Sequence, residues 1–541
     1  MNVTDSAHAR QRGRTAPDGP TLAGAAGSMA VATLVSRLTG FGSKLVLVYV
    51  IGLGVLNDSY TVANTLPNIV YELLLGGVLT SVVVPLLVRA ARDDDDGGLA
   101  YTQRLVTIAA VVLGAATVVA VLAAPLLAWI YLGEDNNANP VLATAFAYLL
   151  LPQILFYGLG ALFGAILNAR SVFGPWAWAP VANNVVIVAT LGVYWLVPGE
   201  ISIDPVRMGD AKLLVLGIGT TLGIAVQAAV MLPALRRVGF RFRWRWGWDP
   251  RLSQAGTLVA WVVGYVLISQ LGYIATTRSA AEGDEGGIAI YAYAWMLFQL
   301  PYGVLGVSLL TAIMPRMSRA AAEGDTDGVV ADLSLGSRYS TLLLLPIAVV
   351  MTVAGSSLGV ALFSFGQSDT DDARRLGLAL AFSAFGLLPF AVTMLQLRVF
   401  YAMTDARTPT MIMLIMTAVK VPLLLACPVL LDDADIVLGL TAVNAGSFVL
   451  GAMVGQLWLR LRLGRLQTAR VLVTVAKALL AAVPAVAAAL AVRSLTVPSG
   501  IAGAWLDLVA TTVVVGVVMA GMLLALRTRE LRPVLARFAR R

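Results

Sequence analysis

The stretch GGVLTSVVVPLLVRAA, at residues 76–91, decides the fold, because it recurs later in the chain as GVSLLTAIMPRMSRAA at 306–321. Each copy ends on a proline that is followed four residues later by an arginine (Pro85 and Arg89, Pro315 and Arg319). Two weaker pairs keep the same order: LVSRLTG (34–40) with LISQLGY (267–273), and NARSVFGP (168–175) with TDARTP (404–409). This shared order predicts an internal repeat of two related halves.

Both copies belong to a strongly apolar chain. Of its 541 residues, 59% are hydrophobic and only 13% are charged, whereas a soluble protein carries about 25% charged residues. A membrane-spanning helix needs about 20 consecutive apolar residues, so the composition predicts an all-α polytopic membrane protein. The single cysteine, Cys427, and the single histidine, His8, exclude an internal disulfide, a Cys- or His-based metal centre and a Ser-His-Asp triad. We therefore expect no metal, no cofactor and no enzyme activity.

Apolar windows bounded by polar, glycine or proline residues predict fourteen transmembrane helices. The expected ranges are 26–55, 59–90, 103–132, 140–168, 176–197, 211–235, 254–277, 287–315, 339–364, 375–402, 408–430, 435–459, 471–493 and 502–526. The intervening loops alternate in charge: 27 basic residues fall in the two tails and the even-numbered loops, and six fall on the opposite side. Because basic loops stay in the cytoplasm, we expect a plasma-membrane protein with both termini cytoplasmic.

Six predicted spans separate the copies of the repeat, so the two halves have the same orientation and are related by an axis along the membrane normal. The expected organisation is a disordered cytoplasmic tail (1–22), an N-lobe of helices 1–6 (23–237), a cytoplasmic interlobe linker (238–253), a C-lobe of helices 7–12 (254–462), two further helices (463–528) and a basic tail (529–541). Two parallel lobes indicate a monomeric transporter that works by alternating access. No pore signature of an oligomeric channel is found.

Ionisable residues inside the predicted spans indicate a substrate site, because each costs about 2.5–3.5 kcal/mol to insert. Arg37 and Lys44 lie seven residues apart, on one face of the first helix. The polar residues expected to line the same lobe are Asp58, Asn64, Asn68 and Glu72. We interpret this set as a cationic cavity for an anionic headgroup, in which Glu72 orients Arg37 or Lys44. The alternative is a buried ion pair that only fixes helix packing.

The second lobe carries a different set of charges. Gln270 occupies the position that Arg37 has in the first lobe, so the two lobes are not electrostatically equivalent. Arg398, near the cytoplasmic end of the tenth span, either snorkels to the membrane surface or contacts a phosphate of the substrate. Lys420 lies deeper, and we hypothesise that it replaces a bound cation as a built-in charge for ion coupling.

Aromatic and basic residues alternate between the lobes, in GFRFRWRWGWDPR at 239–251. Such a pattern can bind single-stranded nucleic acid. At a membrane surface, however, tryptophan anchors in the interface and arginine attracts anionic lipid. We therefore expect anionic membrane lipids as partners and no nucleic acid. Because no GxxxxGK[ST] nucleotide-binding loop is present, transport must draw on an ion gradient, the membrane potential or the gradient of the substrate.

Several ordered blocks resemble the MurJ/MviN family of flippases. They are SRLTGF (36–41), NDSYTVANTLPN (57–68), VVVPLL (82–87), LPQILFYGLGALFGAILNA (151–169), FGPWAWAPVANN (173–184), PYGVLGVSLLTAIMPRMSR (301–319) and VFYAMTDARTPT (399–410). The family belongs to the multidrug/oligosaccharidyl-lipid/polysaccharide exporter superfamily, whose fold has two six-helix lobes. The resemblance implies translocation of lipid II, an undecaprenyl-diphosphate-linked disaccharide-pentapeptide, from the inner to the outer leaflet. It also implies that the last two helices line a groove for the lipid tail.

The family's site residues transfer only in part. The resemblance matches Arg37 to the first-helix arginine and Asp58 to the acid before the second helix, whereas a second first-helix arginine falls at Ser43, beside Lys44. One alternative is a flippase for another polyprenyl-linked glycan. A multidrug antiporter is disfavoured, since cationic drugs need an acidic cavity. A further alternative, of a different class, is a structural scaffold in the cell-wall machinery. We also expect the cell-wall synthesis machinery among the partners.

Overall fold

The computed structural model describes residues 22–73, 83–134, 137–247, 249, 256–403, 405–496, 500–528 and 530. Apart from one isolated bridge between Ile203 and Val206, every element in these ranges is a helix. The expected tails (1–22 and 529–541) fall almost wholly outside the described residues. Parts of the first repeat copy and of the expected linker also lie outside them.

Ten helices form the first part of the chain, and several of them break at prolines. They are α1 (Leu22–Ile51), α2 (Val55–Leu73), α3 (Val84–Asp93), α4 (Leu99–Leu122), α5 (Ala124–Leu132), α6 (Pro140–Leu150), α7 (Gln153–Ala169), α8 (Gly174–Leu196), α9 (Ala211–Ala229) and α10 (Leu232–Arg237). Pro152 precedes α7, and α6 and α7 are bent by 42° relative to one another. Proline lacks the N–H group that would continue the preceding helix, so one apolar stretch becomes two helices.

The second part repeats this mixture of long and broken helices. Its elements are α11 (Gly256–Ala281), α12 (Gly287–Pro301), the π-helix η3 (Tyr302–Gly306), α13 (Val307–Ala322), α14 (Thr326–Phe363), α15 (Thr370–Ser383), the 3-10 helix η4 (Ala384–Gly386), α16 (Leu387–Ala402), α17 (Arg407–Leu430), α18 (Ile436–Leu463), α19 (Thr468–Thr496) and α20 (Gly500–Ala525). The backbone of α14 leaves helical geometry at Ala354, with φ −106° and ψ 16°.

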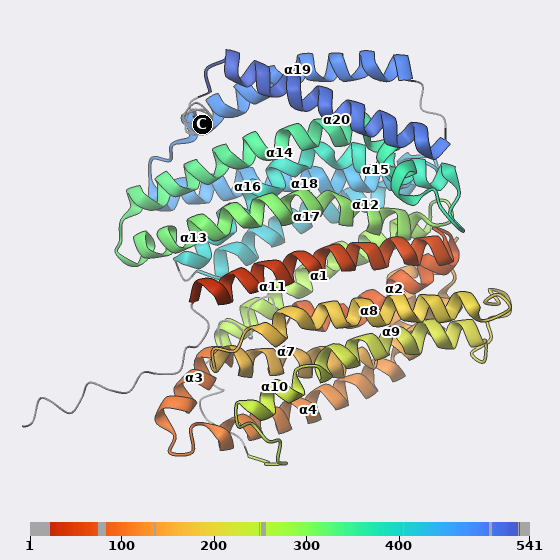
Figure 1. Ribbon diagram of the computed structural model, residues 1–541, viewed down its shortest axis with the longest axis vertical. Helices are drawn as coiled ribbons and strands as arrows, with labels where there is room; N and C mark the ends of the chain where they lie inside the picture. Colours follow the sequence, from red (N-terminus) through yellow and green to blue (C-terminus); the bar gives the residue numbers. More distant parts are fainter. Residues whose placement is uncertain are drawn as a thin grey trace, which may run out of the picture.

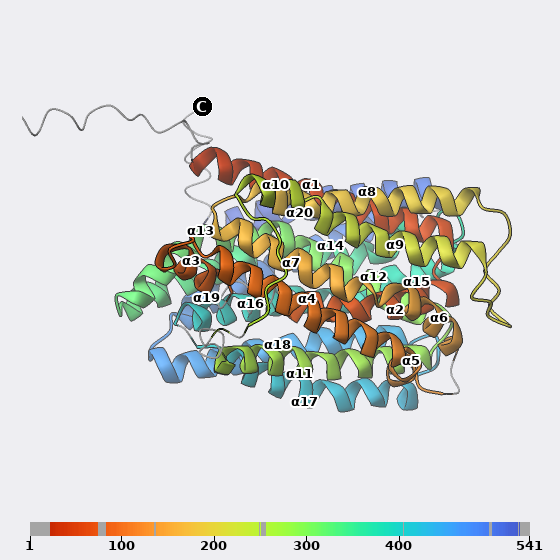
Figure 2. The same ribbon diagram turned by 90° about the horizontal axis from the view of Figure 1, so that it is seen from below.

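The long helices lie side by side and gather into groups (Figure 1). The helices α2–α10 lie at one end of the molecule, α12–α18 lie in the middle, and α19 and α20 pack against α14 at the other end. α1 lies between the first two groups and packs against α8. Viewed from below, α11 lies beside α17 and α18 (Figure 2). We refer to α1–α10 as the N-terminal helices and to α11–α18 as the C-terminal helices.

Eleven helices in the described ranges are long and apolar enough to cross a membrane, or twelve if the bent pair α6–α7 is one span. Their apolar faces are open to the surroundings: on α4, for example, Val112, Val118 and Val119 are exposed. Large exposed apolar surface on a folded chain indicates contact with lipid. A polytopic membrane protein is therefore confirmed, whereas the number fourteen stays a prediction.

Connections between helices meet at two opposite ends. At one end, Arg375 at the start of α15 forms an ion pair of 3.0 Å with Asp284, in the connection between α11 and α12. At the other end, Arg170 after α7 donates a hydrogen bond of 2.8 Å to the carbonyl of Gly97, in the connection between α3 and α4. The odd-numbered loops of the predicted topology meet at the Asp284 end, and even-numbered loops meet at the other.

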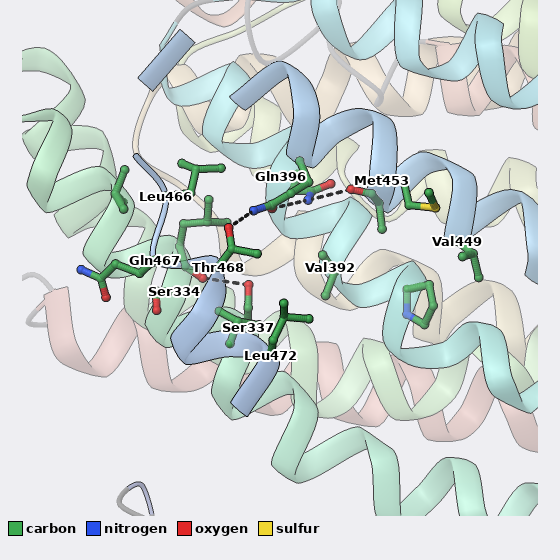
Figure 3. Close-up of a pocket in the computed structure, with 16 residues that line it drawn as sticks. Ser334, Ser337, Val392, Gln396, Val449, Met453, Leu466, Gln467, Thr468 and Leu472 are labelled. Carbon is green, nitrogen blue, oxygen red and sulfur yellow. Dashed lines mark hydrogen bonds between the residues drawn. The ribbon is translucent and has the colours of Figure 1, made fainter. Parts of the chain in front are cut away.

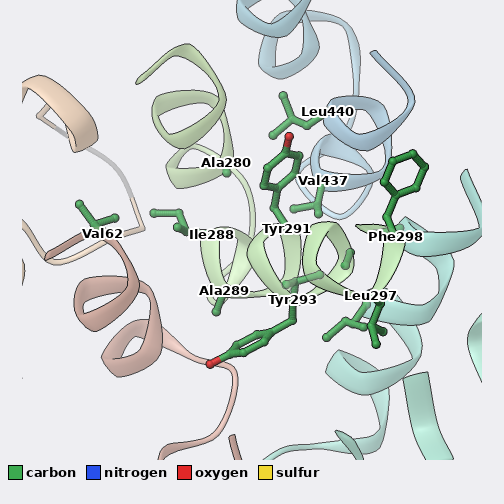
Figure 4. Close-up of a cluster of buried hydrophobic side chains, with 14 of the residues drawn as sticks. Val62, Ala280, Ile288, Ala289, Tyr291, Tyr293, Leu297, Phe298, Val437 and Leu440 are labelled. Carbon is green, nitrogen blue, oxygen red and sulfur yellow. The ribbon is translucent and has the colours of Figure 1, made fainter. Parts of the chain in front are cut away.

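α12 lies in the middle of the main hydrophobic core and contacts both groups of helices (Figure 4). Its Tyr291 side chain extends toward Val437 and Leu440 of α18, whereas Tyr293 extends the opposite way, toward α2. Both tyrosines are buried. The start of α12 is therefore where the N-terminal and C-terminal helices are joined.

Candidate functional site

Asp58, in the first turn of α2, joins the two groups of helices. One carboxylate oxygen accepts the backbone N–H of Ala289 at 2.7 Å, and the other accepts the N–H of Gly286 at 3.0 Å. A carboxylate is stabilised at the positive end of a helix dipole, where N–H groups lack partners within the helix. Asp58 is 2% exposed. The structure therefore places this predicted site residue in a closed contact between α2 and α12.

Residues beside Asp58 tighten this contact. The hydroxyl of Tyr293 donates to Oδ1 of Asn57 at 3.3 Å, so a second side chain crosses between α2 and α12. Gly286 has φ +81°, and a Cβ there would overlap the carbonyl oxygen of Leu53, so only glycine fits. Neither Gly286 nor Tyr293 was among the residues predicted from the sequence. The glycine pair that ends the acidic stretch AEGDEGG (281–287) could have indicated a helix start, because glycine is among the residues favoured at the N-cap.

Gln270 and two tyrosines form a further set of contacts between the groups. Oε1 of Gln270, in α11, accepts a hydrogen bond of 3.2 Å from the Tyr131 hydroxyl in α5. The Tyr273 hydroxyl shares a hydrogen bond of 3.1 Å with Oγ1 of Thr65 in α2. The two tyrosine rings lie 6.0 Å apart between their centroids. Gln270, the predicted counterpart of Arg37, is thus held by a neutral partner from the N-terminal helices.

Of the remaining polar site residues predicted in α2, the structure describes the side chains of Asn64 and Asn68 but not that of Glu72. Asn64 and Asn68 are half-buried one turn apart, and Nδ2 of Asn68 donates to the backbone carbonyl of Asn64 at 3.1 Å. The side chain of Glu72 lies outside the described residues. Its expected orientation of Arg37 or Lys44 therefore stays a prediction.

Arg37 reaches from the N-terminal helices to the C-terminal helices. Its guanidinium group lies directly against Gly303 in η3, where a Cβ would overlap Nη1. The side chain is nevertheless exposed. Asn184 of α8 holds the adjacent turn of α1, because its Nδ2 donates to Oγ1 of Thr39 at 3.0 Å and to the carbonyl of Ser36 at 3.2 Å. This arrangement positions a charged, accessible group at the junction of the two helix groups.

Lys44 is the second cation of α1. It is half-buried, and among the described side chains its ammonium group has no hydrogen-bond or ion-pair partner. The neighbouring Ser43 is buried, and its hydroxyl donates to the carbonyl of Gly40 at 2.8 Å. At these two positions, the charge is therefore carried by Lys44, and an anion could satisfy it.

Arg398 supplies a cation from the C-terminal helices. It is exposed on α16 and lies close enough to Tyr302 for its charge to act on the phenol. Tyr302 directly precedes Gly303, the residue that Arg37 contacts. One accessible guanidinium group from each group of helices therefore lies near this short segment. A pair of guanidinium groups is suited to a phosphate or diphosphate, with which arginine forms bidentate hydrogen bonds.

Lys420 lies elsewhere, inside the C-terminal helices. Its Nζ donates to Oδ1 of Asn444 in α18 at 3.2 Å. Gly272 of α11 leaves the room that the lysine needs, since its Cε and Nζ lie 3.0 and 3.1 Å from the position of a Cβ there. These contacts are with α11 and α18, so they do not bring Lys420 to the Arg37 segment.

The acidic residues of the described ranges do not gather into a metal site: no three His, Cys, Asp or Glu side chains of this part are placed to share an ion. A fully buried acid, Asp507 of α20, lies 3.7 Å from the guanidinium of Arg493 in α19. Arg493 also donates to Oγ of Ser356 in α14 at 2.7 Å. The charges of these two helices therefore serve to hold α19 and α20 on α14.

Comparison with known proteins identifies the family. The family model described as "Lipid II flippase MurJ" matches residues 47–526, which include Asp58, Arg398 and Lys420. The chain belongs to the MurJ family. The match begins after Arg37 and Lys44, so the two cations of α1 precede the matched segment of this MurJ-family chain.

Individual MurJ relatives cover most of the chain. A probable lipid II flippase MurJ of Rhizobium meliloti is 28% identical over 409 residues, which are 73% of each chain. The lipid II flippase MurJ of Burkholderia cenocepacia is 26% identical over 392 residues, or 70% of this chain and 73% of that one. The similarity thus extends through both groups of helices.

Solved structures show the same fold. A lipid II flippase MurJ in an inward closed conformation has a TM-score of 0.74 at 16% identity, covering 94% of this chain and 99% of its own. An inward-facing multidrug transporter of the MATE family has a TM-score of 0.62 at 13% identity, covering 81% and 97%. At these identities the likeness shows the fold alone. This MurJ-family chain therefore shares its fold with both solved structures, and the MurJ structure resembles it more than this multidrug transporter does.

Proposed function

We propose that the protein translocates lipid II from the inner to the outer leaflet by alternating access. Membership of the MurJ family supports the substrate. The observation that carries the proposal is that each group of helices supplies an accessible arginine near the segment Tyr302–Gly303: Arg37 lies against Gly303, and Arg398 lies within electrostatic reach of Tyr302. Accessible cations from both groups of helices can bind the diphosphate of one substrate molecule together, and they separate when the groups move apart.

Alternating access requires a substrate site and also a contact that closes one end of the molecule and can open. The Asp58 contact provides this closure. It consists of hydrogen bonds from two backbone N–H groups to one carboxylate, supported by the Tyr293 hydroxyl. When these bonds break, the start of α12 separates from α2 at that end of the molecule. The π-helical turn η3 lies farther along the same chain segment, and π-helical turns are frequent at functional sites. We propose that α12 and η3 together transmit the change.

We further propose fourteen spans with both termini in the cytoplasm. The two spans beyond the twelve candidates are α2 with α3, and α11. The even-numbered connections carry most of the arginine, which supports a cytoplasmic position for that end. The same proposal gives an N-lobe over 23–237, an interlobe linker over 238–253, a C-lobe over 254–462 and an accessory pair of helices over 463–528. The packing of α19 and α20 on α14 supports that last division.

An apolar cavity of about 260 Å³ supports a path for the lipid tail (Figure 3). It lies between α14, α16, α18 and the beginning of α19, and two of its lining residues, Met453 and Leu472, are exposed. Whole small-molecule sites measure about 300–1,000 Å³, so this cavity holds part of a long isoprenoid chain. We propose that the tail enters past Met453 and Leu472. The resemblance implies a groove lined by both of the last two helices. The cavity is lined by α19 but not by α20, so it agrees with that expectation only in part.

Lys420 is proposed to take part in energy coupling as a permanent positive charge within the C-lobe. Its partner is the neutral Asn444, so its charge is not cancelled by that contact. In this position an ammonium group does what a bound cation would do, namely hold α11, α17 and α18 together around a positive charge. Transport would then depend on the membrane potential or on the substrate gradient.

Reconstitution of the purified protein in vesicles tests the proposed substrate. Fluorescent lipid II is placed in both leaflets, and the fraction that becomes accessible to a membrane-impermeant reagent is measured with time. We expect exchange with lipid II and not with a polyprenyl-diphosphate carrying an unrelated glycan. Exchange of only the unrelated glycan would identify the rival flippase, and exchange of neither would support the scaffold alternative.

A further inference from the structure

A surface feature outside the proposed transport site lies on the N-terminal helices. The segment 240–247, which we call the strap, follows α10 and runs along α4. Its start is a turn at Gly239, which has φ +83°. Nε2 of Gln103 donates to the carbonyl of Arg241 at 2.7 Å, and the N–H of Arg245 donates to Oγ1 of Thr107 at 3.1 Å. The strap is therefore fixed at two points on one helix.

The side chains of the strap are largely presented outward. Arg241, Arg243 and Arg245 are exposed, and so are Trp244 and Trp246, at 63% and 70%. Exposed tryptophan with arginine is typical of the membrane–water interface. The exposed tryptophans therefore lie among the arginines of the strap, as the alternating sequence predicts, and do not pack in the protein core. Phe240 is the exception, because it is buried.

Beneath the start of the strap lies a cavity of about 550 Å³, within the range of small-molecule sites, about 300–1,000 Å³. Its walls are apolar and come from four parts of the fold: Val106 of α4, Phe163 of α7, Leu235 of α10 and Phe240 of the strap. Its polar lining comes from Arg236 and Arg241. Both arginines are exposed, and neither has an ion-pair or hydrogen-bond partner for its guanidinium among the described side chains. The site thus combines an apolar interior with two unpaired cations.

We propose that this cavity binds an anionic phospholipid, with one acyl chain inside and the lipid phosphate between Arg236 and Arg241. An apolar chain is favoured by the walls, and a phosphate oxygen pair matches the guanidinium fork. A free phosphate ion would use the arginines but not the 550 Å³ interior. Single-stranded nucleic acid would use the exposed tryptophans by stacking and would also leave the interior empty. The lipid is the ligand that uses both parts.

Lipid retention by the full-length protein tests the assignment independently of transport. The protein is placed in phosphatidylcholine nanodiscs with rising fractions of phosphatidylglycerol, and retained lipids are counted by native mass spectrometry. We expect wild type to retain phosphatidylglycerol preferentially. In the double variant Arg236→Ala/Arg241→Ala that preference should fall about 25-fold, since two arginines near an anionic lipid together contribute about 2 kcal/mol and every 1.4 kcal/mol is tenfold.

The matched control is Arg243→Ala/Arg245→Ala, which removes the same charge from strap residues that do not line the cavity. It should change the preference less than twofold. Equal losses in both double variants would show diffuse surface attraction and overturn the site, as would a wild type without preference. Leu232→Trp keeps every charge but narrows the cavity, which Leu232 lines. We expect it to reduce retention, and unchanged retention would exclude an acyl chain from the cavity.

Two competitors complete the test. Excess inorganic phosphate and a single-stranded oligonucleotide are each added to the wild-type nanodiscs. Neither should displace the retained phosphatidylglycerol. Displacement by phosphate would show that the acyl chain contributes nothing, and displacement by the oligonucleotide would favour a nucleic-acid surface; either result would contradict the proposal.

Discussion

The carboxylate of Asp58 accepts the backbone N–H of Ala289 at 2.7 Å, so a residue of α2 caps the start of α12. A helix is usually capped by the residue just before it. Here the cap comes from the other half of the chain, 231 residues away. The first turn of α12 therefore gains its cap only while the two groups of helices touch. This relationship couples the local stability of α12 to the closed state of that end of the molecule.

Asp58→Ala should favour the open state of the end that Asp58 closes. The change leaves two buried N–H groups without an acceptor, at about 1–3 kcal/mol for each unsatisfied group. We expect at least a tenfold rise in the labelling rate of a cysteine placed at the buried Ser59, in a Cys427→Ser background. The reagent is a membrane-impermeant thiol probe. Asp58→Asn, which keeps one oxygen acceptor, should have an intermediate effect, and unchanged labelling in both variants would refute the closure.

Gly286→Ala should weaken the same contact by a different route. Alanine at φ +81° costs about 1–2 kcal/mol of backbone strain, and its Cβ would also overlap the Leu53 carbonyl. Gly324→Ala is the matched control, because Gly324 has φ +72° with no neighbouring atom within 4 Å. Thermal unfolding of both purified variants should show a larger loss for Gly286→Ala. Only Gly286→Ala should raise the labelling rate of a cysteine at position 59. Equal losses of stability and equal labelling in the two variants would show that backbone strain, and not the overlap with the Leu53 carbonyl, causes the effect.

Arg37→Ala should abolish function, and Lys44→Ala should only weaken it. Arg37 contacts Gly303 across the junction of the two helix groups, whereas Lys44 has no described partner and acts through its charge alone. Arg37→Lys should be partly active, since lysine keeps the charge but not the bidentate geometry. Growth of a host strain depleted of its own copy measures each variant, with Leu38→Ala as the neighbouring control. Wild-type growth with both Arg37→Ala and Lys44→Ala would argue against a cationic site.

Lys420→Ala should reduce transport more than Asn444→Ala does. The first change removes the proposed built-in charge, whereas the second removes only one hydrogen bond, worth about 0.5–1.5 kcal/mol, and keeps the charge. Vesicle exchange rates at two imposed membrane potentials measure both variants. Full transport by Lys420→Ala at both potentials would dispose of the coupling role.

The ion pair between Asp405 and Arg462 should give the protein a pH-dependent stability. Burial raises the pKa of Asp405, but hydrogen bonds from Thr408 and Arg462 outweigh it and hold the pKa below the ordinary 3.8. The folded form thus keeps its charge to lower pH than the unfolded chain does. The stabilisation is complete above the unfolded pKa and is lost as the pH falls through the folded one.

Asp405→Asn should remove that pH dependence. Because Arg462 is 44% exposed, the pair contributes no more than a surface pair does. We expect a change of about 1 °C in the unfolding temperature. The wild type should lose this advantage over the variant in a thermal-shift series that descends below pH 4. A constant difference between the two proteins across the series would exclude the ion pair as its source.

Much of the helical framework could be predicted from the sequence, because long apolar stretches have few alternatives in a membrane. The bend at Pro152 was not predicted, since apolar periodicity alone does not show where a helix bends. Arg37 and Lys420 stood out for a physical reason: a charge is costly in an apolar span.

The partners of those residues could not be predicted. Asp58 was expected to line a cavity, but the N–H groups that it accepts belong to backbone far along the chain, and backbone donors leave no signal in residue type. Gly272 shows the same limit, because the space that it leaves for Lys420 depends on how α11 and α17 pack. Sequence patterns indicate which side chains need a partner, whereas tertiary packing decides which partner they find.

The most direct test of the central claim is the amount of lipid II in the outer leaflet of the native host after the protein is depleted. The measurement uses a reagent that modifies only outer-leaflet lipid II, with wild type or Arg37→Ala supplied from a second gene copy. The account predicts that outer-leaflet lipid II falls on depletion, that wild type restores it and that Arg37→Ala does not. Unchanged outer-leaflet lipid II after depletion, in a host without another lipid II flippase, would contradict it.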